Sequence, residues 1–326
     1  MIDVLGANPS SLNNKETFRE TRAILKRRAK FLNAIRTYLD SQSVIEVETP
    51  LLYDYPVSDP HIQNLTVASS LYFDRPRYLQ SSPESNLKQL LAKNSGSIYQ
   101  LGKVFRDDPQ GRWHSQEFTM LEWYRIGFDL EDLIEDICRL LDAVGFEGCS
   151  VTHSTYAEVF ERYCKFDPFS VSLEQIRQCA LKMVAADLKD LADCDDRNMW
   201  LDILMSHCVQ PQLGRGGFEF LYDYPSDQAA LADVTVDEKG RAVAKRCELF
   251  YDGIELANAY QELCDADEFE RRFQIDVEVR QRLKLPAREI DQGLLAAMRQ
   301  GLPACAGVAL GVDRLLAVYV SNLLAG

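Results

Sequence analysis

The feature that most constrains this chain is a pair of β-like runs, residues 97–107 and 117–128, joined by a short polar loop. Successive side chains of a strand point to opposite faces, so Phe118 and Glu122 are expected to share a face. Together with Arg106 at the end of the first run, they could hold a flat base, an ammonium group and a phosphate. A structural sheet with salt bridges would give a similar pattern, so the function stays open at this point.

The rest of the chain lacks the regular βαβ alternation of parallel folds, and this predicts an α+β fold with antiparallel strands flanked by helices. No Pro/Gly/Ser-rich linker divides the 326 residues. We therefore expect one domain over residues 17–326, preceded by a lead-in over residues 1–16. A helical insertion is expected within this domain at about 129–240. Further helices are expected at 17–41, after Ser81-Ser82-Pro83-Glu84, at 268–284 and from 313, and further strands at 44–52, 246–262 and 306–312.

Charge narrows the classes of partner. With 50 acidic and 36 basic residues, the net charge is −14, which argues against a protein that coats nucleic acid. The helix at 17–41 is a basic exception within this acidic chain. Its basic stripe is either a solvated face or a docking surface for a partner, and the sequence leaves both possibilities open.

The cysteines and the apolar runs indicate the compartment. Nine cysteines occur without any Cys-x-x-Cys spacing, which is typical of reduced thiols in a cytoplasmic protein. No signal peptide and no membrane-spanning run is apparent, so no membrane partner is expected.

The run 246–262 predicts a β-hairpin, because Asp252-Gly253 is a typical two-residue turn. With that turn Glu248 should pair with Ala257. Glu248 and Glu255 should then lie diagonally on one face, with their Cβ atoms roughly 7–8 Å apart. Two such carboxylates can share Mg²⁺ that is bound mainly to phosphate oxygens. Two solvated surface glutamates would explain the pattern as well.

Three further polar residues of the second hairpin strand, Asn258, Tyr260 and Glu262, have the opposite parity to Glu255. They can join the same site only if the strand contains a bulge near residues 256–257.

The strand at 306–312 carries small residues at 307, 309 and 311, which leaves space for a ligand near the backbone. Arg314 follows at a helix start, where it could reach an anion. Close helix packing would explain the small residues equally well.

Three motifs of this sequence, taken in their order along the chain, resemble the three motifs of class II aminoacyl-tRNA synthetases. Pro50 fits the end of the first motif, Phe105-Arg106-Asp107-Asp108 the second, and Gly307 through Arg314 the third. Asp108 stands where that family usually has glutamate.

Within class II, the segments His114–Glu122 and Glu255–Leu263 are most similar to lysyl-tRNA synthetase, except that Ser115-Gln116 replaces Asn-Pro. Two departures point to a paralog of that enzyme that modifies elongation factor P. The chain starts almost at the first-motif helix, so no anticodon-binding domain is expected, and Ala309 replaces a pocket glycine.

The resemblance implies that ATP activates (R)-β-lysine, or lysine, and that the product is transferred to a lysine of elongation factor P. It also implies Mg²⁺ and a homodimer, with no tRNA substrate. Arg106 and Arg314 would be catalytic, and Glu248 and Glu255 would hold the metal. The implied ATP-binding residues are Arg106, Asp107, Asp108, His114, Ser115, Phe118, Glu248, Leu249, Gly311 and Arg314. The implied amino-acid-binding residues are Ser82, Pro83, Glu84, Glu122, Tyr124, Glu255, Asn258, Tyr260, Glu262 and Ala309.

Other functions remain open from the sequence. One is a tRNA-charging fragment that borrows its RNA-binding part from another protein. A second is a regulatory paralog that senses an amino acid without catalysis. A paralog resembling asparagine synthetase is a third, although the glutamates suit a dication better than an aspartate.

Overall fold

The computed structural model describes residues 14–68, 72, 75–184, 188, 191 and 194–325. The chain forms two compact units: one contains the residues up to Glu147 and again from Cys264, and the other contains Gly148–Leu263. Of the expected lead-in, residues 1–13 lie outside the described residues, and the next three already belong to the first helix.

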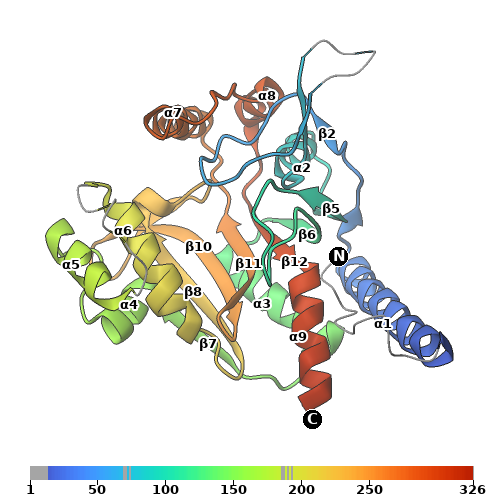
Figure 1. Ribbon diagram of the computed structural model, residues 1–326. Coiled ribbons are helices and arrows are strands. Elements are labelled where there is room, and N and C mark those ends of the chain that lie inside the picture. The colour runs from blue at the N-terminus through green and yellow to red at the C-terminus, as the bar shows by residue number, and fades with distance from the viewer. Residues whose placement is uncertain are drawn as a thin grey trace. The chain divides into compact units, whose positions relative to one another are not determined.

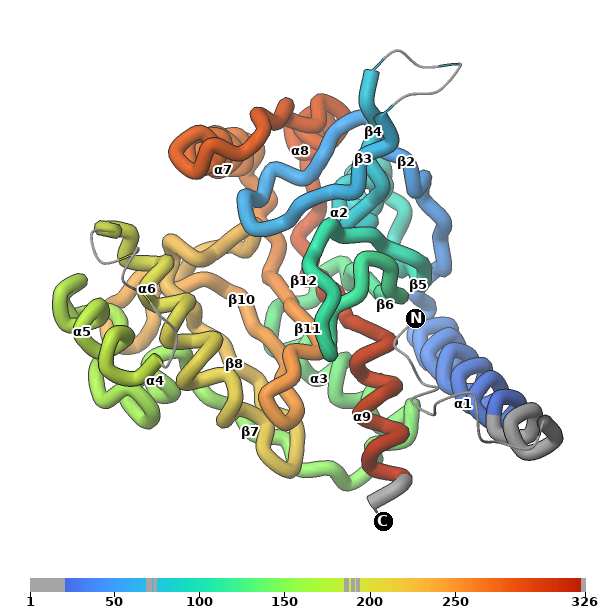
Figure 2. The backbone as a smooth tube through the Cα atoms, viewed as in Figure 1, coloured from blue at the N-terminus to red at the C-terminus, as the bar shows by residue number. Residues whose placement is uncertain are grey.

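The first unit contains four strands in the order β1-β5-β6-β12 and a separate small sheet β2-β4-β3 (Figures 1 and 2). The β1–β5 pairing is parallel, whereas β5–β6 and β6–β12 are antiparallel. Its strands are β1 (Ile45–Glu46), β2 (Leu52–Tyr53), β3 (Thr66–Val67), β4 (Arg77–Leu79), β5 (Ile98–Phe105), β6 (Glu117–Ile126) and β12 (Cys305–Gly311). Its helices are α1 (Asn14–Ser41), α2 (Glu84–Leu91), α3 (Leu130–Leu141), α7 (Ala266–Arg282), α8 (Gln292–Gly301) and α9 (Val312–Ala325), with a π-helical turn at Asp142–Phe146.

The central strand β6 alternates as its sequence predicts. One set of side chains contacts the helices: the Trp123 indole donates to buried Asp136 of α3, and Tyr38 of α1 donates to the same carboxylate. The other set includes Glu122 and Tyr124, which are hydrogen-bonded to each other. One face of β6 therefore belongs to the core, and the other carries the residues of the predicted site.

The second unit contains β11, β10, β8 and β7 in that order, with β9 paired to β10, and only β7–β8 is parallel. Its helices gather on one side of these strands (Figure 1), where buried aromatic residues such as Tyr156, Phe160 and Trp200 form the core. The strands are β7 (Val151–Thr155), β8 (Phe218–Pro225), β9 (Val234–Val236), β10 (Ala242–Tyr251) and β11 (Ile254–Gln261). The helices are α4 (Tyr156–Cys164), α5 (Leu173–Met183) and α6 (Arg197–Leu204), with short turns at Met205–Val209, Gln210–Gln212 and Ser226–Gln228.

The hairpin β10–β11 has the expected turn, but the residues of its two strands are paired in a different register from the one expected. Both turn residues have positive φ, 46° at Asp252 and 76° at Gly253, as a primed two-residue turn requires. The expected pairing of Glu248 with Ala257 is wrong, because Glu248 lies opposite Asn258. A register shift leaves Leu256 as an extra residue on β11, which is a bulge at the place where one was needed for Asn258 to share the face of Glu255.

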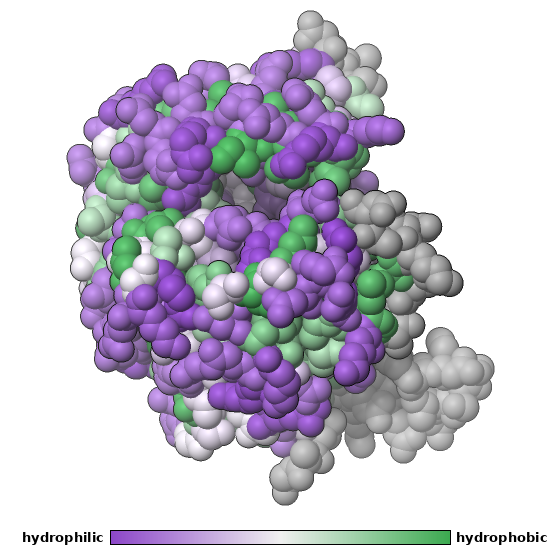
Figure 3. Space-filling view, turned by 90° about the vertical axis from the view of Figure 1, so that its left-hand side faces the viewer, coloured by the Kyte–Doolittle hydropathy of each residue, from purple (hydrophilic) through white to green (hydrophobic). Residues whose placement is uncertain are grey.

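These elements confirm the α+β class. The basic stripe of α1 is partly used inside the first unit, since Arg28 binds Asp313 of α9 and Arg36 binds Glu46. All nine cysteines are thiols rather than disulfides. Among the described residues, no helix is long and apolar enough to cross a membrane. The face drawn in Figure 3 is mostly hydrophilic, with scattered apolar patches.

Candidate functional site

The first group lies where the segment that begins α2 contacts strand β6, and we call it the amino-acid cluster. It contains four predicted site residues, Ser82, Glu84, Glu122 and Tyr124, together with Lys88, which was not predicted. Glu122 is 2% exposed, and both of its carboxylate oxygens accept hydrogen bonds, from Ser82 Oγ at 2.6 Å and from Tyr124 OH at 2.8 Å. Pro83 immediately precedes α2, and the backbone N–H of Glu84 donates to Ser82 Oγ at 3.0 Å. The start of α2 thus brings two carboxylates into one neighbourhood.

The two carboxylates influence each other. Burial and, next, the negative charge of Glu84 raise the pKa of Glu122 to about 8, against the opposing effects of its hydrogen bonds and of Lys88. A group with this pKa releases its proton readily when a cation arrives beside it. The cluster is therefore suited to an ammonium group.

Strand β12 supplies the small residues opposite this face. Gly307, Ala309 and Gly311 lie in register with Tyr124, Glu122 and Met120. Directly opposed residues of antiparallel strands point to the same face, so the methyl group of Ala309 lies beside the stem of Glu122.

The second group, which we call the phosphate cluster, contains Arg106, His114 and Arg314 with Phe118. The Arg106 guanidinium lies 5.4 Å from the centre of the Phe118 ring, and its Nε donates to Ser81 O at 3.4 Å. Arg314 Nε donates to Trp113 O at 3.1 Å, which connects the start of α9 to the loop before β6. An aromatic plate with two guanidinium groups can hold a nucleotide base and its phosphates.

The pKa of His114 is shifted by the charged groups around it. Partial burial and the positive charges of Arg314 and Arg106 lower its pKa, whereas Asp108 opposes the change. The loop therefore brings the expected residues Asp108, His114, Arg106 and Arg314 within electrostatic reach of one another. Ser115 lies in the loop that leads into β6.

Asp107 anchors this loop. Its carboxylate accepts from Gln116 Nε2 at 3.0 Å, and its backbone N–H donates to Gln63 O at 2.8 Å.

The third group belongs to the second unit, and we call it the hairpin cluster: Tyr224, Arg246, Glu248 and Asn258. Glu248 accepts hydrogen bonds from Tyr224 OH at 2.7 Å, from Asn258 Nδ2 at 3.3 Å and from Arg246. Asn258 Oδ1 is buried and has no hydrogen-bond partner among the described residues, so an acceptor remains for a ligand donor.

Four other expected residues lie on the same unit. Glu255 pairs with Phe250, two positions along from Glu248, so the two carboxylates share a face about 7 Å apart along the strand. Tyr260 is in register with Arg246, buried Glu262 forms an isolated bridge with Ala232, and buried Leu249 lies opposite Ala257.

The hairpin offers hard oxygen donors but no complete metal cage. No group of three or more His, Cys, Asp or Glu side chains in the described part of the chain could hold an ion. The pair Glu248 and Glu255 nevertheless fits Mg²⁺, which proteins commonly bind through one or two carboxylates while phosphates and water complete the coordination.

Several structural partners were missed from the sequence. Lys88 follows Glu84 by four residues on α2, a helical spacing that could have indicated the pair. Arg28 binds both Asp313 and Thr119, each of which neighbours a predicted nucleotide-binding residue. A contact between residues 28 and 313 has no local signal.

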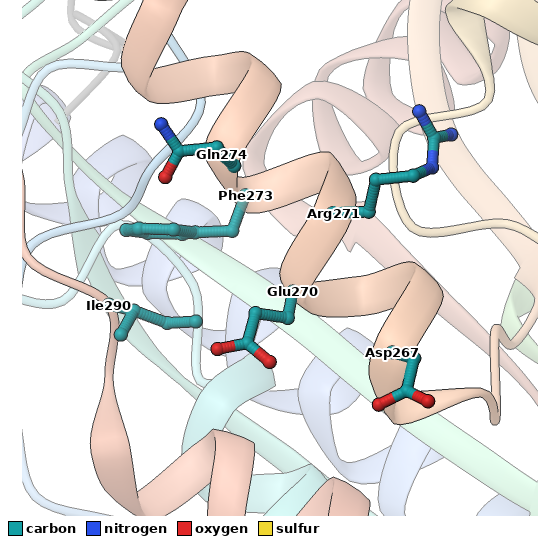
Figure 4. Close-up of a pocket in the computed structure, with 6 residues that line it drawn as sticks. All are labelled: Asp267, Glu270, Arg271, Phe273, Gln274 and Ile290. Carbon is teal, nitrogen blue, oxygen red and sulfur yellow. The ribbon is translucent and has the colours of Figure 1, made fainter.

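A separate hollow beside α7 contains none of the predicted residues (Figure 4). Phe273 and Ile290 form its apolar wall, and Glu270 and Asp267 lie at one end. Glu270 is already paired with Arg299. We assign this hollow no part in the chemistry.

Comparison with known proteins agrees with this arrangement. The model of the family "tRNA synthetases class II (D, K and N)" matches residues 15–322. Three curated proteins named elongation factor P–(R)-β-lysine ligase, from Photorhabdus laumondii, Proteus mirabilis and Yersinia pestis, are each 40% identical to this chain. The matches extend over 298, 299 and 298 residues, and each covers 90% of both proteins.

Proposed function

The chain belongs to the class II tRNA synthetase family of the aspartate, lysine and asparagine enzymes, and from this premise we propose that it is an ATP-dependent ligase for elongation factor P. It activates (R)-β-lysine as the adenylate and transfers the β-lysyl group to the ε-amino group of a lysine on that factor. We place this reaction in the cytoplasm and assign it to a homodimer, without a tRNA substrate.

The observation that carries the proposal is the amino-acid cluster. Glu84 and buried Glu122 provide negative charge beside a strand of small residues, which suits a compact substrate with two ammonium groups. The same unit carries two arginines and an aromatic plate, as expected for a nucleotide.

The first step needs positioning and charge neutralisation rather than a covalent enzyme nucleophile. The substrate carboxylate oxygen attacks the α-phosphorus in line, forming a P–O bond while the bond to pyrophosphate breaks. Arg106 holds the α-phosphate, Arg314 holds the γ-phosphate, and Phe118 stacks on adenine. Both guanidinium groups stabilise the charge that grows on the phosphate oxygens.

In the second step, the neutral ε-amine of the acceptor attacks the adenylate carbonyl carbon and forms an amide bond. AMP leaves with the electron pair of the broken C–O bond, and the attacking nitrogen releases one proton. Glu248 and Glu255 would hold Mg²⁺, which neutralises phosphate charge when bound. Asn258, Tyr260 and Glu262 are assigned to the amino acid.

Mass spectrometry of purified elongation factor P tests this function after incubation with the enzyme, ATP, Mg²⁺ and either lysine isomer. We expect one added lysyl residue, with more product from the β-isomer. Charging of tRNA instead of the factor would favour a tRNA-charging enzyme. Absence of ATP–pyrophosphate exchange with both isomers would favour a non-catalytic sensor.

Ala309 is expected to set the preference between isomers. Its methyl group lies beside Glu122, where it narrows the space around the α-carbon and favours an amino group on the β-carbon. A difference of one methyl group in a pocket changes selectivity by about 10–200-fold. In Ala309→Gly, the ratio of kcat/KM for β-lysine to kcat/KM for α-lysine should therefore fall by about 10–200-fold. Ala306→Gly, on the opposite face of the same strand, should leave the ratio unchanged. An unchanged ratio in Ala309→Gly would refute this role.

A further inference from the structure

The amino-acid cluster contains a lysine that none of the assigned roles uses. Lys88 is only 1% exposed, and its Nζ lies 2.7 Å from Glu84 Oε1, one helical turn away on α2. Lysine is almost never buried unless it is paired, because an ammonium group loses its hydration inside a protein. A solvated pair at this spacing would contribute little, but here one partner lies wholly inside the unit.

Lys88 also influences the second carboxylate. Its positive charge lowers the pKa of Glu122, against the larger effects of burial and of the Glu84 charge. The cation therefore acts on both carboxylates at once. Besides Glu84 and Lys88 of α2, titratable tyrosines face Glu122: Tyr124 on its own strand and Tyr53 of β2. The uncharged neighbours are Ser82, Gln100 of β5 and Ala309 of β12.

The charge balance of the cluster explains why a buried cation is useful there. Two carboxylates that repel each other in a desolvated place cannot both ionise easily, and one of them takes up a proton. A protonated carboxyl group neither attracts an ammonium group nor accepts as many hydrogen bonds from it. A fixed positive charge beside the two carboxylates weakens their mutual repulsion and so favours the ionised form that attracts an ammonium group.

We propose that Lys88 is a positioning residue of the amino-acid site: its buried ammonium group holds Glu84 in place and lowers the cost of negative charge on Glu84 and Glu122 side by side. This inference rests on the proposed function, because it assigns both carboxylates to the ammonium groups of the substrate. Lys88 itself does not touch the reacting atoms.

Lys88→Met tests the inference, since methionine keeps the length and the apolar stem but removes the charge. In amino-acid-dependent ATP–pyrophosphate exchange, we expect the KM for β-lysine at pH 7 to rise about tenfold, with little change in kcat or in the KM for ATP. Without the positive charge of Lys88, the pKa of Glu122 rises further above 7, so a smaller fraction of this carboxyl group is ionised at pH 7. The defect should shrink as the pH approaches 9, because the carboxyl group then ionises in both enzymes.

Two comparisons make the result decisive. Lys93→Met removes an exposed lysine just beyond the same helix and should leave the pH profile unchanged. Glu84→Gln/Lys88→Met removes the two opposing charges together, so the midpoint of its pH profile should return toward that of the wild type although its KM stays high. If Lys88→Met does not fold, Glu84→Gln serves as the reference, and the double variant should have the higher midpoint of the two.

The outcomes separate this inference from the proposed function. A wild-type enzyme without lysine-dependent exchange would contradict the function itself. An active wild type whose pH profile coincides with that of Lys88→Met would overturn the role of Lys88 and leave the function intact. A loss that is equal at every pH would mean that Lys88 serves the fold alone.

Discussion

Replacing Arg106 by alanine should slow ATP–pyrophosphate exchange about 10²–10³-fold, the size of effect seen when one group that stabilises transition-state charge is removed. Arg106 directly follows β5 and lies beside the Phe118 ring, where Ser81 O accepts a hydrogen bond from its Nε. A planar guanidinium so held can contact two phosphate oxygens at once. The loss should fall mainly on kcat and on the KM for ATP, with little change in the KM for the amino acid.

Two variants define what the side chain contributes. Arg106→Lys keeps the positive charge but loses the planar fork, so we expect only partial recovery. Arg112→Ala serves as the control, because Arg112 is an exposed residue of the loop that follows, and its guanidinium lies over the Trp113 ring, 5.1 Å from the ring centre. Exchange within a few-fold of wild type in Arg106→Ala, with unchanged thermal stability, would contradict the assignment of Arg106 to the α-phosphate.

The strands that carry the site could be predicted because their signals are local. Alternation along 117–126 identified the face of Glu122, and the Asp252-Gly253 dipeptide identified the hairpin. The bulge at Leu256 was required only if Asn258 joined the face of Glu248, and the structure has the two side chains hydrogen-bonded. The direct pairing with Ala257 failed because one extra residue on a strand shifts every later partner.

The partners of the site residues could not be predicted, because burial and long-range contacts depend on packing. Lys88 and Lys93 look alike in the sequence, yet one is buried against Glu84 and the other is exposed. Arg28 looked like one member of a basic stripe, but it binds Asp313 across 285 positions of the chain. The hypothesis that the basic stripe of α1 is a docking surface therefore applies only to those basic side chains of the helix that point to solvent.

The buried carboxylate of Asp136 should be the most sensitive position for stability. Asp136 is 0% exposed, and it accepts from Tyr38 OH at 2.5 Å and from Trp123 Nε1 at 3.1 Å, with Arg125 Nε 3.6 Å away. Asp136→Ala would remove the acceptor for both hydrogen bonds and the counter-charge of Arg125. We expect the free energy of unfolding to fall by about 3–5 kcal/mol, as measured by chemical denaturation, since breaking a buried ion pair has this cost.

Charge and hydrogen bonding can be separated at this position. Asp136→Asn keeps one acceptor oxygen and should cost about 1–3 kcal/mol. Asp136→Leu combined with Arg125→Met removes both charged partners, and it should be less destabilising than Asp136→Leu alone, because no uncompensated charge stays buried. Glu135→Gln is the control on the same helix: its side chain is 71% exposed, and solvent screens its pair with Arg139, so the change should have little effect on stability. Equal losses in Asp136→Ala and Glu135→Gln would mean that the Asp136 carboxylate does not connect α1, α3 and β6, and that apolar packing alone supports the strand that carries Glu122.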